Sequence, residues 1–432
     1  MGVLRHGPPH LFFEHRGVAS DPHDWSELAA TGFVMNAAAR ADAPHDRIAR
    51  VAIVSFILTV LRRRAPEVTQ AFSSAAVNCP TEKGNSRVTA PARSSSRAIR
   101  DLLTREIDLG SFPGAVWAVG TADGIADEGA VGLAVSVPLR VKATLDTIYD
   151  CASLTKPLIT GMLVLQAVAE GRISLDDAFH GYTYRELLTH TTGLRAWLPL
   201  YAFDDYLSAA IERGPEIPRG SDVIYSDLNF VLLWYALREI YGDYVEAARS
   251  RIFAPLGLSD AYLLPPSSLK PRIAPTEWGQ RWEAKMCAER KIACNRNREG
   301  LIWGETHDGN SHYAGGTAGN AGLFATAREV FRLAQSWLRA ELLPSVLIAD
   351  ATRNHTLTLS DARGLGWQKP TGSAATKMLS AEAYGHAGFT GTSLWIDGGQ
   401  IFVLLTNRVH PCAAPVAMQR VRGEFHTLAK GG

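Results

Sequence analysis

A serine and a lysine three residues apart are the clearest candidates for covalent chemistry in this chain. The motif Ser153-Leu-Thr-Lys156 follows a strand-like stretch at 147–149 and precedes a long apolar run. Residues i and i+3 share one face of a helix, so the lysine amine can reach the serine hydroxyl. Free N–H groups and the dipole at a helix N-terminus also favour an oxyanion. We predict Ser153 as nucleophile and Lys156 as its general base, which requires a lysine pKa low enough for a neutral amine. A helix N-cap serine with a solvated lysine is the structural alternative.

A second polar cluster, Tyr225-Ser226-Asp227, lies further along the chain. Its tyrosine can relay a proton with Lys156, and Asp227 or Asn229 can hold a substrate amide. The alternative is a tyrosine at the edge of the core, with Ser226 or Asp227 capping the following helix.

The third cluster, His386-Ala-Gly388-Phe389, stands in a glycine-rich stretch before a strand. Glycine beside a strand lets a ligand approach the backbone closely, so we expect Gly388 to contact substrate. The N–H groups of Ser153 and Phe389 are the expected oxyanion donors, each typically worth about 10²–10³ in rate. His386 is expected to line the site, although a histidine in this setting is often structural.

These residues must be positioned by an α+β fold whose strands come from both ends of the region after residue 96. Helical spacing at 98–107 and strand patterns at 114–120 and 129–137 precede Ser153. Near the other end, strand patterns at 392–396 and 401–405 flank an Asp-Gly-Gly hairpin turn. We predict one antiparallel sheet flanked by helices, with a mostly helical insertion and the site in the cleft between them.

The predicted domain from 96 to 432 has a sheet region at about 96–160 and 325–432 and a helical region at about 160–325. Helices are expected within the latter at 158–169, 184–188, 201–213 and 230–241.

Residues 1–95 differ in composition, with five of the 13 histidines in the first 50 residues and a serine-rich stretch at 81–97. We expect a poorly ordered extension and linker, with a possible helix near 47–64. The apolar run Val51–Leu61 is shorter than the roughly 20 residues that span a bilayer, so we expect no transmembrane segment. Three arginines follow it where a signal cleavage site would begin. The compartment stays open, with the cytoplasm as default and the periplasm as alternative.

A net charge of +1 and 46% hydrophobic residues describe an ordinary globular protein without the basic stripe of a nucleic-acid binder. The five cysteines favour isolated thiols, with a Cys287–Cys294 bridge or metal site as the less supported alternative. No P-loop, H-E-x-x-H or G-x-S-x-G motif is present, and we expect no cofactor or metal. The oligomeric state is left open.

In this order, the three clusters resemble the motifs of the serine β-lactamase and penicillin-binding-protein-like family, in particular its class C-like, esterase and muropeptide-amidase-like branch. The resemblance covers roughly 96–425. Five further segments resemble family blocks: ELLTHTTGL at 186–194, IFAPLGL at 252–258, GETHDGN at 304–310, GGTAGNAGLFAT at 315–326 and LTNRVHP at 405–411.

The resemblance implies a β-lactamase/transpeptidase-like fold and a two-step acyl transfer on a small or peptide-like ester or amide. Ser153 would be acylated, and Lys156 and Tyr225 would activate it and relay the proton. Alternatives within the family are a D-Ala-D-Ala carboxypeptidase, a peptidoglycan-fragment amidase, a weak β-lactamase or a silent binding protein. Three positions depart from the pattern: His386 replaces a lysine that helps bind a substrate carboxylate, Asp227 replaces asparagine, and Asn320 replaces a frequent histidine.

Overall fold

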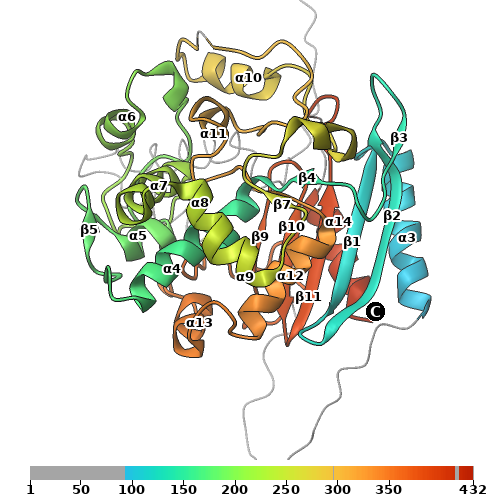
Figure 1. The fold of residues 1–432 in the computed structure, drawn as a ribbon. Coiled ribbons are helices and arrows are strands. Elements are labelled where there is room, and N and C mark those ends of the chain that lie inside the picture. Colours follow the sequence, from blue (N-terminus) through green and yellow to red (C-terminus); the bar gives the residue numbers. More distant parts are fainter. Residues whose placement is uncertain (1–92, 295, 414–417, 432) are drawn as a thin grey trace, which may run out of the picture. The chain divides into compact units, whose positions relative to one another are not determined.

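The computed structural model describes residues 93–431, except 295 and 414–417 (Figure 1). The chain divides into the units Met1–Thr89 and Ala90–Gly432, and everything below concerns the second. The expected N-terminal extension and the helix near 47–64 therefore lie outside the described residues, apart from the first residues of a helix that begins at Arg93.

A six-stranded antiparallel sheet confirms the predicted α+β architecture. Its strand order is β3-β2-β1-β11-β10-β9, so strands from both ends of the domain pair at its centre, with Ala115 opposite Thr406. The bounds are β1 Gly114–Thr121, β2 Gly124–Val135, β3 Val141–Lys142, β9 Tyr384–Ala387, β10 Ser393–Asp397 and β11 Gln400–Thr406. Strand β2 starts five residues before the predicted position. The strand pattern missed its first half because those residues are polar and partly exposed.

Both faces of the sheet are buried by helices (Figure 1). Helices α3 (Arg93–Asp108) and α14 (Met418–Ala429) cover one face, and α12 (Ala327–Leu338) covers the other. Side chains along a strand alternate between faces. Accordingly, Trp117 packs in the core under α3 and α14, whereas Val116 packs in the larger core toward the helical region.

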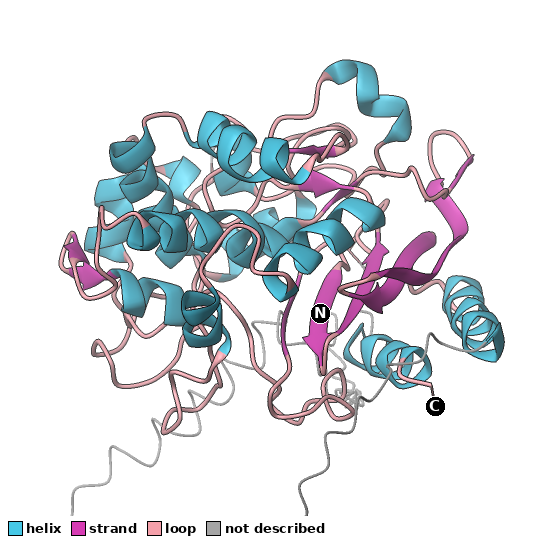
Figure 2. Ribbon diagram, turned by 60° about the horizontal axis from the view of Figure 1, so that its bottom comes forward, coloured by secondary structure: helices cyan, strands magenta, loops and turns pink. Residues whose placement is uncertain are grey.

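The helical region joins β4 to β9 and carries only short strands (Figure 2). Its predicted helix at 201–213 is broken: Leu200–Ala202 forms a 3₁₀ turn, and Asp205 caps a new helix, α6, by accepting a hydrogen bond from the Leu207 N–H. The helix predicted from residue 230 already begins at Asp227. The helices are α4 Met162–Ala169, α5 Tyr184–Thr189, α6 Tyr206–Arg213, α7 Asp227–Tyr241, α8 Tyr244–Ala248, α9 Ala254–Leu256, α10 Arg281–Glu289, α11 Gly309–Tyr313 and α13 Ser345–Thr352. The strands are β4 Tyr149–Asp150, β5 Ala178–Phe179, β6 Tyr182–Thr183, β7 Ala261–Tyr262 and β8 Phe324–Ala325.

The predicted nucleophile opens a continuous helical run that passes through the core. A 3₁₀ turn, Ala152–Leu154, leads into a π-helical segment, Lys156–Gly161, and then into α4. Within the described residues, the run 152–169 is the one stretch long and apolar enough to cross a membrane by length and composition. Because 89% of it is buried inside the protein, it is a core helix in character.

Candidate active site

Ser153 lies in a tight turn that is held from two sides. The preceding residue, Ala152, has φ 47°, in the left-handed region that costs a non-glycine residue about 1 kcal/mol or more. The Asp150 carboxylate fixes this turn by accepting hydrogen bonds from the Ala152 N–H at 2.8 Å and from the His307 N–H at 2.7 Å. The turn that carries the predicted nucleophile is therefore tied directly to the segment that precedes α11.

Lys156 contacts both Ser153 and the second predicted motif. Its Nζ lies 2.9 Å from Ser153 Oγ, 3.1 Å from the Asn320 carbonyl oxygen and 2.6 Å from Asp227 Oδ1. The lysine side chain is fully buried, whereas Asp227 retains a small exposed surface. The S-x-x-K spacing thus brings the amine to the hydroxyl as expected, and Asp227 is its ion-pair partner.

This ion pair bears on the requirement that Lys156 be neutral to act as a base, because the pKa of the lysine is raised rather than lowered. Burial by itself lowers the pKa of Lys156, but the Asp227 carboxylate and Tyr225 outweigh it, and the net shift is upward. Burial also raises the pKa of Asp227; Lys156 opposes this, and the nearby Asp308 carboxylate adds to it. Because its pKa is raised, Lys156 is an ammonium in the free protein. Because the pKa of Asp227 is raised as well, this carboxylate accepts a proton more readily than an exposed aspartate does.

Tyr225 borders the same amine. The centre of its ring lies 5.0 Å from Lys156 Nζ and 5.6 Å from the ring of His386. Burial raises the pKa of Tyr225, although Lys156 and the Ser153 hydroxyl act in the opposite direction. The phenol is thus protonated at neutral pH and can act as a proton donor.

A buried histidine that was not singled out from the sequence positions the tyrosine. His190 ends α5 with φ 59°, and its Nδ1 accepts a hydrogen bond from the Ser226 N–H at 3.0 Å. Its ring centre lies 4.8 Å from that of Tyr225. Burial holds the pKa of His190 well below its usual value, helped by the Arg363, Lys156 and His386 charges. The imidazole is neutral and serves as an acceptor; its place in the 186–194 block was the available sequence signal.

Asn229 belongs to this supporting network rather than to an open substrate site. Its Oδ1 accepts a hydrogen bond from Thr192 Oγ1 at 2.6 Å, and its Nδ2 lies 3.2 Å from His190 Nδ1. The side chain is completely buried. This position is a correction to the expectation that Asn229 holds a substrate amide.

The third predicted cluster lies against the nucleophile turn. A Cβ atom on Gly388 would lie 2.7 Å from the Cys151 carbonyl oxygen and 2.1 Å from Thr392 Oγ1, so this approach requires glycine. Thr392 and Thr390 donate hydrogen bonds to the carbonyl oxygens of Cys151 and Asp150. The segment 388–392 is thereby fixed against residues 150–152, directly before Ser153.

His386 occupies β9 opposite Leu394 and is almost fully buried. Its Nδ1 lies 2.9 Å from the Ala387 carbonyl oxygen, which assigns the proton to Nδ1. The structure thus places His386 beside Tyr225, as a wall of the site.

Three further side chains complete this wall, and one of them, His307, lies in the GETHDGN block at 304–310. Trp282 and His307 flank Phe389, with ring centres 5.5 and 5.4 Å from its own. The Arg363 guanidinium carbon lies 5.1 Å from the centre of the Tyr225 ring, and one arm of that guanidinium pairs with Asp361. Arg363 comes from a loop without periodicity, which explains why the sequence did not indicate it.

Helix α10, which carries Trp282, is held by a buried glutamate and a disulfide. Glu283 accepts hydrogen bonds from Tyr201 Oη at 2.9 Å and from the Gly309 N–H at 2.7 Å. The Cys287–Cys294 disulfide corrects the expectation of isolated thiols for this pair. Cys151 and Cys412 are free. Throughout the described ranges, no group of three or more His, Cys, Asp or Glu side chains is arranged to hold a metal ion.

The site thus brings Ser153, Lys156 and Tyr225 together beside an antiparallel sheet with a helical insertion. The sequence matches the Beta-lactamase family over residues 99–424. A protein of Escherichia coli K12 named "Putative D-alanyl-D-alanine carboxypeptidase" is 31% identical over 322 residues, which cover 64% of this chain and 72% of the relative. The chain therefore belongs to the Beta-lactamase family, whose members are serine hydrolases.

Solved structures share the fold. A penicillin-binding-protein homologue from Caulobacter crescentus aligns with a TM-score of 0.61 at 20% identity, over 79% of this chain and 99% of the other. EstCE1, described as a hydrolase with promiscuous acyltransferase activity, aligns with a TM-score of 0.60 at 16% identity, over 78% and 99% of the two chains. At these identities the likeness concerns the fold alone.

Proposed function

We propose that Ser153 carries the acyl-enzyme of this hydrolase and that its substrates are small or peptide-like esters and amides. The observation that carries the proposal is the 2.9 Å contact between Lys156 Nζ and Ser153 Oγ inside a buried site. A free serine hydroxyl is a weak nucleophile, so a base within hydrogen-bonding distance is the requirement that this contact supports.

The ion pair supplies a route to that base. When substrate displaces water, the Lys156 proton passes to Asp227, leaving a neutral amine and a neutral carboxylic acid, because a low dielectric disfavours separated charges. The amine then takes the Ser153 proton while Oγ bonds to the substrate carbonyl carbon. The negative charge develops on the carbonyl oxygen, and the N–H groups of Ser153 and Phe389 stabilise it.

Tyr225 completes the acylation step. Its phenol gives a proton to the leaving amine or alkoxide as the scissile bond breaks, and the Lys156 ammonium returns a proton to the phenolate. Lys156 and Asp227 are then ready for a second round in which water replaces Ser153 as nucleophile and the acyl group is released. His190, Asn229 and the Asp150 carboxylate act as positioning residues in this scheme.

We further propose peptides that end in D-alanyl-D-alanine as the first substrate class to examine. This rests on the name of the 31% identical relatives, and His386 in place of a lysine is the feature that separates this site from β-lactam-hydrolysing members.

The test uses the full chain, Ser153→Ala and the matched surface variant Ser250→Ala. Each is incubated with p-nitrophenyl acetate and with diacetyl-Lys-D-Ala-D-Ala, and the acyl-enzyme is sought by intact-protein mass spectrometry. We expect covalent adducts and turnover in wild type and Ser250→Ala, and neither in Ser153→Ala. Equal hydrolysis by Ser153→Ala would refute the assignment, and ester turnover without D-alanine release would refute the peptide substrate alone.

A further inference from the structure

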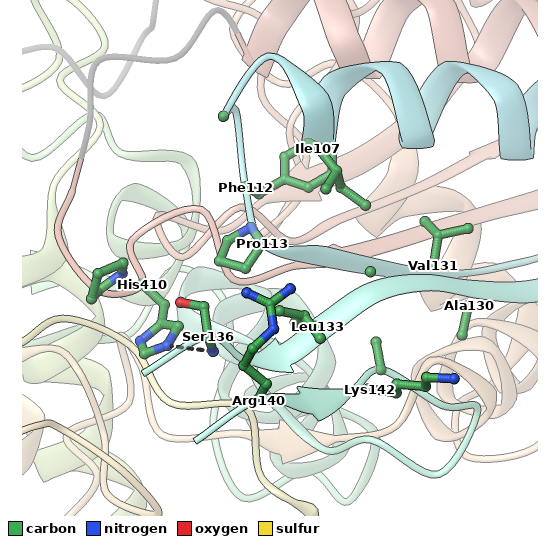
Figure 3. A pocket seen from close by; sticks show the side chains of 14 residues that line it. Ile107, Phe112, Pro113, Ala130, Val131, Leu133, Ser136, Arg140, Lys142 and His410 are labelled. Atoms are coloured by element: carbon green, nitrogen blue, oxygen red, sulfur yellow. Dashed lines mark hydrogen bonds between the residues drawn. The ribbon is translucent and has the colours of Figure 1, made fainter. Parts of the chain in front are cut away.

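A concavity lined by none of the predicted site residues lies at the edge of the sheet, where β2 and β3 meet the C-terminal end of α3 (Figure 3). Its volume is about 650 Å³, which lies within the range of ligand-binding pockets. It is lined by Ile107, Gly110, Phe112, Pro113, Ala130, Val131, Gly132, Leu133, Ser136, Arg140, Lys142, Ala143, His410 and Pro411.

The lining combines an apolar floor with two cations. Arg140 extends between Ser136 and Leu133 toward Pro113, so that its guanidinium lies over the pocket (Figure 3). Both Arg140 and Lys142 are exposed, and neither forms an ion pair with any described carboxylate. No aspartate or glutamate belongs to the lining. Two unneutralised positive charges beside an apolar surface favour a ligand that is both anionic and apolar.

Exposed apolar side chains concentrate around this pocket. Of the nine large apolar side chains exposed in the described part of the domain, Leu109, Val137 and Leu139 adjoin pocket residues in sequence. A fourth, Trp278, donates its backbone N–H to the carbonyl oxygen of the lining residue Pro411. Leu109 is 68% exposed and Leu139 is 59% exposed. An apolar rim of this kind marks an interaction surface.

The loop that carries Val137 and Leu139 is anchored at its base. His410 Nε2 accepts hydrogen bonds from the Ser136 and Val137 N–H groups at 3.1 and 3.4 Å, and its Nδ1 lies 3.0 Å from the Thr276 carbonyl oxygen. The imidazole therefore holds the end of β2 against the C-terminal region. The tip of the loop, with Leu139 and Arg140, is presented to solvent from a fixed base.

We propose that this face docks on an anionic lipid surface, with lipid phosphate at Arg140 and Lys142 and acyl carbon against the rim and the pocket floor. A small soluble anion would satisfy the two cations but would leave the protruding rim in water. A lipid interface satisfies both, because apolar side chains insert at the acyl boundary while basic side chains remain among the head groups. The proposal is independent of the substrate assigned to Ser153.

The experiment is co-sedimentation of the full chain with vesicles of phosphatidylcholine alone and of phosphatidylcholine with phosphatidylglycerol. We expect wild type to favour the anionic vesicles by at least about ten-fold, because each basic side chain near such a surface adds measurable attraction. Arg140→Glu should lose most of this preference, and the exposed, distant Lys377→Glu should keep it. Leu139→Asp should weaken binding, and Leu357→Asp, at an exposed leucine outside the pocket, should not.

Hydrolysis of p-nitrophenyl acetate should be unchanged in all four variants, which shows that they are folded. Failure of wild type to bind anionic vesicles would overturn the proposal. Equal losses in Arg140→Glu and Lys377→Glu, or binding of monomeric decanoate without binding of vesicles, would also overturn it.

Discussion

Lys156 Nζ and Asp227 Oδ1 lie 2.6 Å apart inside the site, so the amine that we propose as acceptor of the serine proton is already paired with a carboxylate. Because two ionisable groups this close interact strongly, we expect them to titrate as a coupled pair. The acid side of the pH–rate profile should therefore report the pair rather than an isolated lysine.

Replacing Asp227 by asparagine should move the acid limb of kcat/KM to higher pH. In wild type, we expect activity to fall as pH drops through the raised pKa of Asp227, because a protonated Asp227 cannot take the lysine proton. In Asp227→Asn that carboxylate is gone, and burial lowers the pKa of Lys156, which then sets the limb. We expect a shift of more than about one pH unit.

Asp308→Asn should shift the acid limb of kcat/KM in the opposite direction from Asp227→Asn. The Asp308 carboxylate raises the pKa of Asp227, so its removal should move the acid limb to lower pH. Profiles of kcat/KM for wild type and both variants decide the matter. Identical acid limbs in wild type and Asp227→Asn would contradict a proton-holding role for the aspartate.

Tyr225→Phe should separate substrates by their leaving groups. Loss of a general acid typically costs about 10²–10⁴ in rate, and we expect this loss for amide substrates. Hydrolysis of p-nitrophenyl esters should suffer much less, since p-nitrophenolate leaves without a proton. An equal loss for both substrates would show that the phenol acts in binding or folding instead.

Gly388→Ala should disrupt the nucleophile turn. The new Cβ would overlap Thr392 Oγ1 and the Cys151 carbonyl oxygen, so the 388–392 segment has to move away from Ser153. We expect destabilisation of about 1–3 kcal/mol from overpacking, together with a large drop in acylation rate. Gly300→Ala is the control, because nothing lies within 4 Å of its Cβ position. Acylation at the wild-type rate in Gly388→Ala would be incompatible with this packing.

Glu283 should make the protein less stable as pH rises. Burial, followed by the Asp308 charge, raises its pKa from 4.5 to about 6 in the folded state. The folded state thus binds the proton more tightly, and this contribution is complete below pH 4.5 and lost as pH rises through about 6. The linkage corresponds to about 2 kcal/mol.

Urea unfolding of wild type and Glu283→Gln across this pH range measures that contribution as the difference between the two curves. The control is Glu299→Gln, because Glu299 is exposed. Gln280 is left unchanged, because it donates a hydrogen bond to Glu283. A wild-type curve parallel to that of Glu283→Gln would disprove the assignment.

The sheet could be predicted because its strands alternate apolar side chains between two buried faces, as in β1 and β11. The first half of β2 was not predicted because Asp127 and Glu128 interrupt its apolar pattern. The helix predicted at 201–213 was too long because Asp205 caps a new helix inside that range, which periodicity alone does not indicate. These are local effects that override a long-range pattern.

At the site, motif order predicted Ser153, Lys156 and Tyr225, which the structure brings close together, but it could not predict their electrostatics. The charge state of Lys156 depends on its distance to Asp227, 71 positions later in the chain, which only the packing of α7 fixes. Arg363 and the Cys287–Cys294 bridge likewise depend on where irregular loops fold back.

The pairing of β1 with β11 has a consequence for biosynthesis. Its partners lie about 290 residues apart in the chain, and such distant contacts form late and slowly. The middle of the sheet therefore stays incomplete on the ribosome until β11 has emerged. In a nascent or truncated chain that lacks the last strands, β1 is paired with β2 alone, so its other edge stays exposed and invites aggregation.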